Sequence, residues 1–95
     1  MGQTIEKPRV GGPGTGLGGA WNVIVKNDQH NTFDGVADAL ARHIPGIDLD
    51  RGYAIAGLID RSGLAIVWTG HKELAEHYWE LLKGEGLTMA PLEPA

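Results

Sequence analysis

The chain has 95 residues, of which 42% are hydrophobic, so it predicts one small domain with a modest core. It contains no cysteine, which excludes disulfides and thiolate catalysis, and its net charge of −4 with scattered basic residues disfavours binding to nucleic acid or anionic membranes. No apolar run is long enough to cross a bilayer and the N-terminus lacks the apolar core of a signal peptide, so we expect a cytoplasmic protein.

Residues 1–20 contain seven glycines, two prolines and few large apolar side chains. Such a segment buries little apolar surface, so we expect a flexible N-terminal extension before a folded domain over residues 21–95. The extension carries the spacing Gly-x-Gly-x-x-Gly at Gly14, Gly16 and Gly19. A dinucleotide loop needs a strand before it and a helix after it. Here a predicted strand follows, so the spacing does not indicate a nucleotide site.

The first strand is predicted over residues 21–26, which are rich in β-branched side chains. A polar cluster follows, and a helix then begins at Phe33 with Asn31 or Thr32 as N-cap and Asp34 in its first turn. The motif Pro45-Gly46 ends this helix. Its apolar residues recur at helical spacing and form one continuous face: Phe33, Val36, Ala37, Leu40, Ala41 and Ile44.

A second helix is predicted from the N-cap Asp48 to Ile59 or Asp60. Gly52 and Gly57 weaken it, although glycines also allow a helix to pack closely against a sheet. The tripeptide at residues 61–63, Arg-Ser-Gly, predicts a turn, and residues 64–69 predict the second strand.

The third helix is predicted to begin at Thr69 or Gly70 and to end at Gly84. Residues 87–92 form the last strand, which Pro91 places at an edge or near its end. The order β-α-α-β-α-β predicts an α+β sandwich in which a three-stranded antiparallel sheet packs against three helices. The inward stripe expected for the third helix consists of Leu74, Tyr78, Leu81 and Leu82.

Catalytic and metal sites are poorly supported. Ser62 lies in the predicted turn and lacks a Gly-x-Ser-x-Gly elbow. His71 and His77 are six residues apart, which places them on different faces of a helix, and an i, i+4 pair of Glu73 and His77 is common on solvated surfaces. We therefore expect no enzyme, no metal and no cofactor; the alternative, a small hydrolase or metal-dependent enzyme, would turn over substrate by itself.

The polar cluster after the first strand allows two interpretations. Asn27 and Asp28 either cap the following helix and shape its turn, or they bind a polar ligand. The segment Asn-Val-Ile-Val-Lys-Asn-Asp at residues 22–28, the helix after it, the Gly-x-Ala-Ile strand at residues 63–66 and the Lys-Glu-Leu-Ala-Glu helix at residues 72–76 resemble the ClpS adaptor family over about residues 20–93.

That resemblance implies a monomeric adaptor that binds N-degron substrates with Phe, Leu, Tyr or Trp at the N-terminus and delivers them to a Clp AAA+ unfoldase of ClpA or ClpC type. It implies that the substrate's free amine is bound by Asn27, Asp28 and the residue at position 60, where the family has His and this chain has Asp60. Glu73 matches an unfoldase-docking acid, and the N-terminal extension matches one that engages the unfoldase. The implied side-chain pocket is lined by Val25, Asn31, Phe33, Val36, Ala56, Ile59 and Thr88.

This chain departs from the ClpS pattern in the implied pocket. Ala56 replaces a gatekeeper Met and Phe33 stands where Met is usual, so we expect looser selection among large apolar residues. Asp60 leaves open an alternative, a ClpS-like peptide- or protein-binding module with altered specificity.

Overall fold

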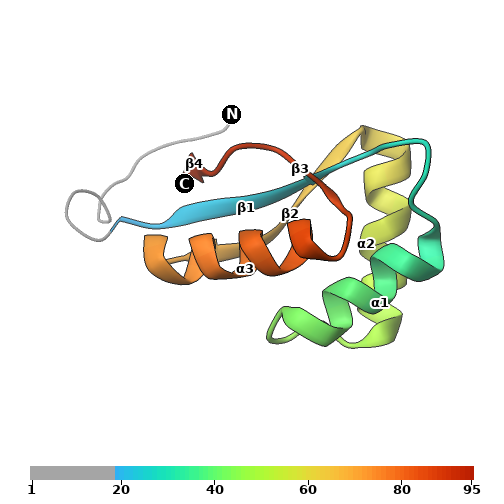
Figure 1. The fold of residues 1–95 in the computed structure, drawn as a ribbon, viewed down its shortest axis with the longest axis horizontal. Helices are drawn as coiled ribbons and strands as arrows, with labels where there is room; N and C mark the ends of the chain where they lie inside the picture. The colour runs from blue at the N-terminus through green and yellow to red at the C-terminus, as the bar shows by residue number, and fades with distance from the viewer. Residues whose placement is uncertain (1–18) are drawn as a thin grey trace.

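The structure is a computed structural model, and it describes residues 19–95 (Figure 1). The predicted extension, with its Gly-x-Gly-x-x-Gly spacing, lies outside the described residues except for its last two positions. The elements in chain order are β1 (Trp21–Lys26), α1 (Phe33–His43), α2 (Leu49–Ser62), β2 (Leu64–Gly70), α3 (Lys72–Gly84), β3 (Thr88–Met89) and β4 (Glu93–Pro94).

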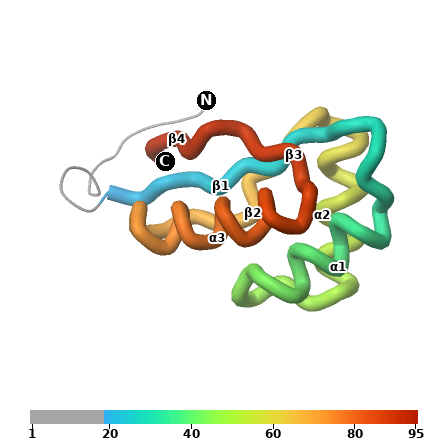
Figure 2. The backbone as a smooth tube through the Cα atoms, in the orientation of Figure 1, coloured from blue at the N-terminus to red at the C-terminus, as the bar shows by residue number. Residues whose placement is uncertain are grey.

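The sheet is antiparallel, with β1 between β2 and β3, and β4 also pairs with β1. Val25 of β1 lies opposite Ala65 on one side and Met89 on the other. Figure 2 shows the C-terminal segment following β1 along its length, so that both short strands lie beside it. The predicted α+β class, with three helices and an antiparallel sheet, is confirmed.

The last strand differs from the prediction. The continuous strand expected over residues 87–92 is instead two strands of two residues each, β3 and β4. The Ala90 N–H still donates to the Ile24 carbonyl (3.1 Å). Pro91 follows and has no N–H to donate, so the ladder is interrupted there and resumes two residues later.

Local capping explains where the first two helices begin and end. The Thr32 side chain accepts from the Gly35 N–H (2.9 Å) at the start of α1, and the Asp48 side chain accepts from the Arg51 N–H (2.8 Å) at the start of α2. Gly63 ends α2 in the left-handed conformation, at φ +91°. The predicted turn is therefore the last turn of α2 and its cap, and the helix is longer than expected.

The inward face of α3 also differs from the prediction. His71, rather than Thr69 or Gly70, precedes the helix. Leu74 is 46% exposed, whereas Ala75 and Leu82 are fully buried against the sheet. The buried face follows residues 75, 78, 79 and 82, which recur at i, i+3, i+4 and i+7, so Leu74 lies to one side of it.

Helices α1 and α2 form a pair at the C-terminal end of β1, while α3 runs along the sheet (Figure 1). A Cβ on Gly52 would lie 2.6 Å from the Ala37 carbonyl oxygen, so the close approach that glycine permits is to α1 and not to the sheet. The first residue of α1, Phe33, is 48% exposed and does not belong to the buried face expected for it. It lies instead beside the pocket described below.

No helix within residues 19–95 combines the length and the apolar character needed to cross a bilayer.

Candidate functional site

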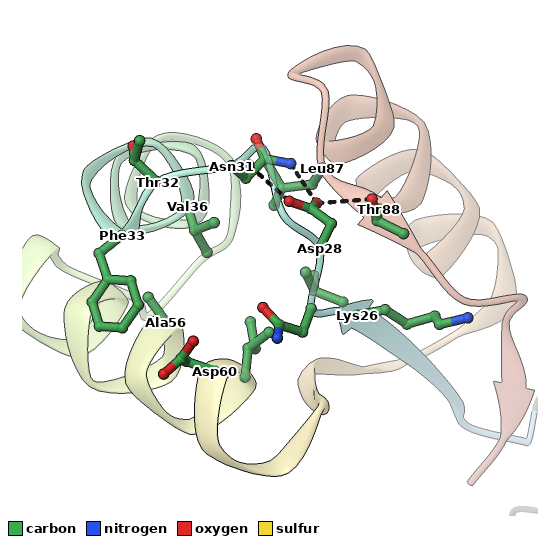
Figure 3. Close-up of a pocket in the computed structure, with 13 residues that line it drawn as sticks. Lys26, Asp28, Asn31, Thr32, Phe33, Val36, Ala56, Asp60, Leu87 and Thr88 are labelled. Carbon is green, nitrogen blue, oxygen red and sulfur yellow. Dashed lines mark hydrogen bonds between the residues drawn. The ribbon is translucent and has the colours of Figure 1, made fainter.

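A small pocket with a cavity volume of about 60 Å³ lies where β1 ends and α1 begins (Figure 3). The C-terminal half of α2 and the start of β3 complete its walls. The residues that line it are Val25, Lys26, Asn27, Asp28, Asn31, Thr32, Phe33, Val36, Ala56, Ile59, Asp60, Leu87 and Thr88.

All ten residues that the resemblance implied for amine and side-chain binding line this pocket, and their binding roles stay predictions. Lys26, Thr32 and Leu87 line it in addition. None of these three residues was among those predicted for the pocket, because the sequence indicates a helix cap at Thr32 and a strand residue at Leu87. For Lys26, the one available signal is its position directly before the Asn-Asp pair. Glu73 lies elsewhere, exposed in the first turn of α3.

The Asp28 carboxylate organises the polar side of the pocket. Its Oδ1 accepts from the backbone N–H groups of His30 (3.0 Å) and Asn31 (2.7 Å). Its Oδ2 accepts from Asn31 Nδ2 (2.6 Å) and from the Thr88 hydroxyl (2.8 Å). A carboxylate has about four lone-pair sites. Donors of the protein therefore occupy the hydrogen-bonding capacity of Asp28.

These hydrogen bonds also set the charge of Asp28. The Asn31 backbone N–H makes the largest contribution, and together with the Asn31 amide, the Thr88 hydroxyl and the His30 N–H it holds the pKa of the Asp28 carboxyl far below its ordinary range. Asp28 is thus a fixed negative charge at the pocket wall.

Two further polar side chains remain available to a ligand. The Asn27 backbone is fixed by the hydrogen bond from its N–H to the Gly63 carbonyl (2.8 Å), but its side chain is exposed. Asp60, near the end of α2, is also exposed and lies beside Ala56 and Phe33 (Figure 3). Within residues 19–95, neither side chain makes a hydrogen bond to the protein.

The rest of the lining is apolar. Val25, Val36, Ala56 and Ile59 are buried members of the core that also contact the pocket. Phe33 lies with Ala56 on one side, and Asp28 with Thr88 on the other (Figure 3). Carboxylate and amide groups next to an apolar surface can hold a ligand that carries a cation and an apolar group close together.

The turn between α3 and β3 is held by two sets of contacts, one to the loop before α1 and one to the end of α1. Asn31 Nδ2 donates to the Gly86 carbonyl (2.9 Å). Glu85 accepts from Arg42 Nη1 (2.5 Å), and His43 Nε2 lies 2.7 Å from the same carboxylate oxygen. These contacts fix the position from which Thr88 reaches Asp28.

The described part of the chain does not bring three or more His, Cys, Asp or Glu side chains together in a way that could hold a metal ion. His71 and His77 both lie exposed on α3 or at its N-cap.

Comparisons with known proteins agree with the resemblance. Residues 18–93 match the family described as ATP-dependent Clp protease adaptor protein ClpS. The ATP-dependent Clp protease adapter protein ClpS of Synechocystis sp. is 51% identical over 75 residues, which cover 79% of this chain and 76% of that protein. The protein of the same name from Thermosynechococcus vestitus is 49% identical over 74 residues, covering 78% and 79%.

A solved structure supports the fold independently. The structure of Agrobacterium tumefaciens ClpS2 bound to L-phenylalaninamide matches with a TM-score of 0.77 at 20% sequence identity, and it covers 83% of this chain and 100% of that one. With the family match over most of its length and relatives at about half identity, the chain belongs to the ClpS family of adaptors of the ATP-dependent Clp protease.

Proposed function

We propose that this adaptor binds the free N-terminal amine and the large hydrophobic first residue of N-degron substrates and delivers them to a Clp AAA+ unfoldase, without catalysing a reaction itself. The observation that carries the proposal is the pocket, in which a fixed carboxylate charge and two available polar side chains adjoin an apolar lining. The ClpS2 structure bound to L-phenylalaninamide supports the same class of ligand.

The amine is held by Asn27 and Asp60 directly and by the charge of Asp28. An α-ammonium has a pKa near 8 and is mostly charged at neutral pH. Asp28 already accepts four hydrogen bonds, so it attracts the ammonium mainly as a nearby negative charge. Asn27 and Asp60 are exposed at the pocket and free to accept the ammonium N–H groups. Each hydrogen bond to a charged group contributes about 1.5–3 kcal/mol.

The first side chain occupies the apolar part of the pocket. Ala56 leaves space on the α2 side that a larger residue would fill, and Val36 and Ile59 supply further apolar surface. Phe, Leu, Tyr and Trp are the first residues that such a lining favours, because they bury the most apolar area. The small Ala56 also admits β-branched residues.

The test is fluorescence anisotropy with labelled peptides that differ only at position one, beginning with Phe, Leu, Val, Met or acetyl-Phe. We expect the free-amine Phe and Leu peptides to bind and acetyl-Phe to bind at least 10-fold more weakly, because acetylation removes the charge. Equal binding of the acetylated and free peptides would refute the amine site.

A second candidate rests on Asp60, which lines the pocket where the family has His. In this candidate the chain is a ClpS-like peptide- or protein-binding module whose specificity has moved away from N-degrons. Failure of every free-amine peptide, together with recovery of Phe-peptide binding by Asp60→His, would favour it.

Delivery requires docking to the unfoldase at a second surface, and Glu73 is exposed on α3 outside the pocket. Glu73→Lys should slow degradation of a Phe-started fluorescent substrate by the cognate Clp protease while the anisotropy titration is unchanged. The adaptor alone should not cleave that substrate.

A further inference from the structure

Lys26 lines the pocket but belongs to neither the proposed amine site nor the apolar part of the lining. It is the last residue of β1 and directly precedes Asn27. Its side chain is exposed and leaves the pocket on the side of Asp28 away from Phe33 and Asp60 (Figure 3). Among the residues that line the pocket it carries the positive charge, against the negative charges of Asp28 and Asp60.

Lys26 has no anionic or aromatic partner within residues 19–95. The salt bridges there involve Arg42 and His43. The other two lysines of that region, Lys72 and Lys83, lie over the rings of tryptophans. The cross-strand neighbours of Lys26 are Leu64 and Thr88, which are neutral. An exposed ammonium with neutral neighbours is available to a ligand at small desolvation cost.

We infer that Lys26 forms a subsite for an acidic side chain at the second or third position of a bound N-terminal segment. This inference rests on the proposed function, because it takes the substrate's amine to lie by Asn27 and Asp60. An extended chain advances about 3.3–3.6 Å per residue. In this inference the bound segment leaves the pocket along the Lys26 side, so its second or third side chain lies beside the exposed Lys26 ammonium.

The charges of the complex support an acid at this place. The pocket lining carries two carboxylates, Asp28 and Asp60, and one cation, Lys26, so the bound α-ammonium brings the sum of these charges to zero. When the ammonium is bound, the pocket has no net negative charge to repel an acidic side chain of the substrate. An Asp or Glu side chain beside Lys26 is then attracted by the Lys26 ammonium. Without Lys26, the same acid would face an uncompensated carboxylate charge.

The experiment measures the coupling between Lys26 and the substrate acid by anisotropy. Free-amine peptides beginning Phe-Gln-Gln, Phe-Glu-Gln, Phe-Gln-Glu and Phe-Lys-Gln are titrated into the wild-type protein, Lys26→Gln and Lys26→Glu, with acetyl-Phe-Gln-Gln as the reference for the amine. Lys72→Gln is the matched control, since Lys72 lies over Trp21 and outside the pocket.

We expect the ratio of Glu-peptide to Gln-peptide affinity to be roughly 1.5- to 5-fold higher in the wild type than in Lys26→Gln, as for an exposed ion pair. Lys26→Glu should reverse the preference in favour of Phe-Lys-Gln, Lys72→Gln should keep the wild-type ratio, and added salt should reduce it.

An unchanged ratio in Lys26→Gln, with Phe-Gln-Gln bound and its acetylated form rejected, would overturn the subsite and leave the proposed function standing. If the free-amine and acetylated peptides bound equally, or neither bound, both the amine site and the subsite would be wrong.

Discussion

Asp28→Asn tests the central feature of the pocket, because it replaces a carboxylate that accepts four hydrogen bonds with an amide of the same shape. The amide oxygen can keep the two backbone N–H donors of His30 and Asn31. The amide NH₂ then faces Asn31 Nδ2, which is also a donor, and the Thr88 hydroxyl must turn to accept. One hydrogen bond is lost and two donors are opposed.

The contacts and the burial of Asp28 allow both effects to be estimated. Loss of the Asn31 contact should reduce the free energy of unfolding by about 1–3 kcal/mol, toward the lower end because the site is only half-buried. Loss of the negative charge near the substrate ammonium removes a charge–charge attraction without a direct hydrogen bond, and it should cost about 0.2–1 kcal/mol of binding free energy, a roughly 1.5- to 5-fold rise in Kd.

The stability effect should also depend on pH. The folded-state pKa of Asp28 lies below the unfolded value of about 3.9, so the carboxylate stabilises the folded protein above that pH and loses its contribution as the pH falls. Urea unfolding at pH 7 and at pH 3 measures this: the wild type should exceed Asp28→Asn in stability at pH 7, and the difference should shrink at pH 3.

Glu80→Gln provides the control, since Glu80 is exposed on α3 and makes no salt bridge within residues 19–95. Its titration and unfolding should match the wild type within error. If Asp28→Asn also unfolded like the wild type and bound a Phe-started peptide with the same Kd, the organising role assigned to Asp28 would be wrong.

Three further changes test the packing, the pocket and the extension. Gly52→Ala places a Cβ 2.6 Å from the Ala37 carbonyl oxygen, so urea unfolding should show a free energy of unfolding lower by about 1–3 kcal/mol. Gly84→Ala is the control, because a Cβ there has open space around it and should leave the stability unchanged. Equal stabilities of the two variants would refute the close contact at Gly52. Ala56→Met should weaken binding of Ile- and Val-started peptides more than of Phe-started ones in the anisotropy assay, and an unchanged ranking would count against the gatekeeper position. Deletion of residues 2–18 should leave peptide affinity intact and slow degradation of an N-degron substrate, so lost affinity would contradict the separation of binding from delivery.

Much of the site was predictable because a family resemblance supplied it residue by residue. The Asn-Asp pair after the first strand and Asp60 near the end of the second helix lie far apart in the sequence, yet the structure brings them to one pocket. Spacing in the sequence does not reveal this proximity, and the residue types of Asn27 and Asp28 fit a helix-capping turn equally well. The binding roles stay predictions until the peptides are titrated.

The sequence by itself determined the helices and the first two strands, because their signals are local. Thr32 and Asp48 cap helices through N–H groups three residues away, and Gly63 ends a helix with its own backbone conformation. Helical periodicity located the buried faces of the first and third helices well in their middle and less well at their N-terminal ends, where Phe33 and Leu74 are exposed.

Only the tertiary structure decided which residues far apart in the sequence contact each other. Thr88 donates to Asp28 across sixty residues of sequence, and Gly52 faces α1 rather than the sheet. Lys26 has no ionic partner within residues 19–95, because the sheet register places Leu64 and Thr88 beside it. Such pairings depend on how strands align and helices cross, and a shift of one residue would exchange the partners, so no local pattern in the chain specifies them.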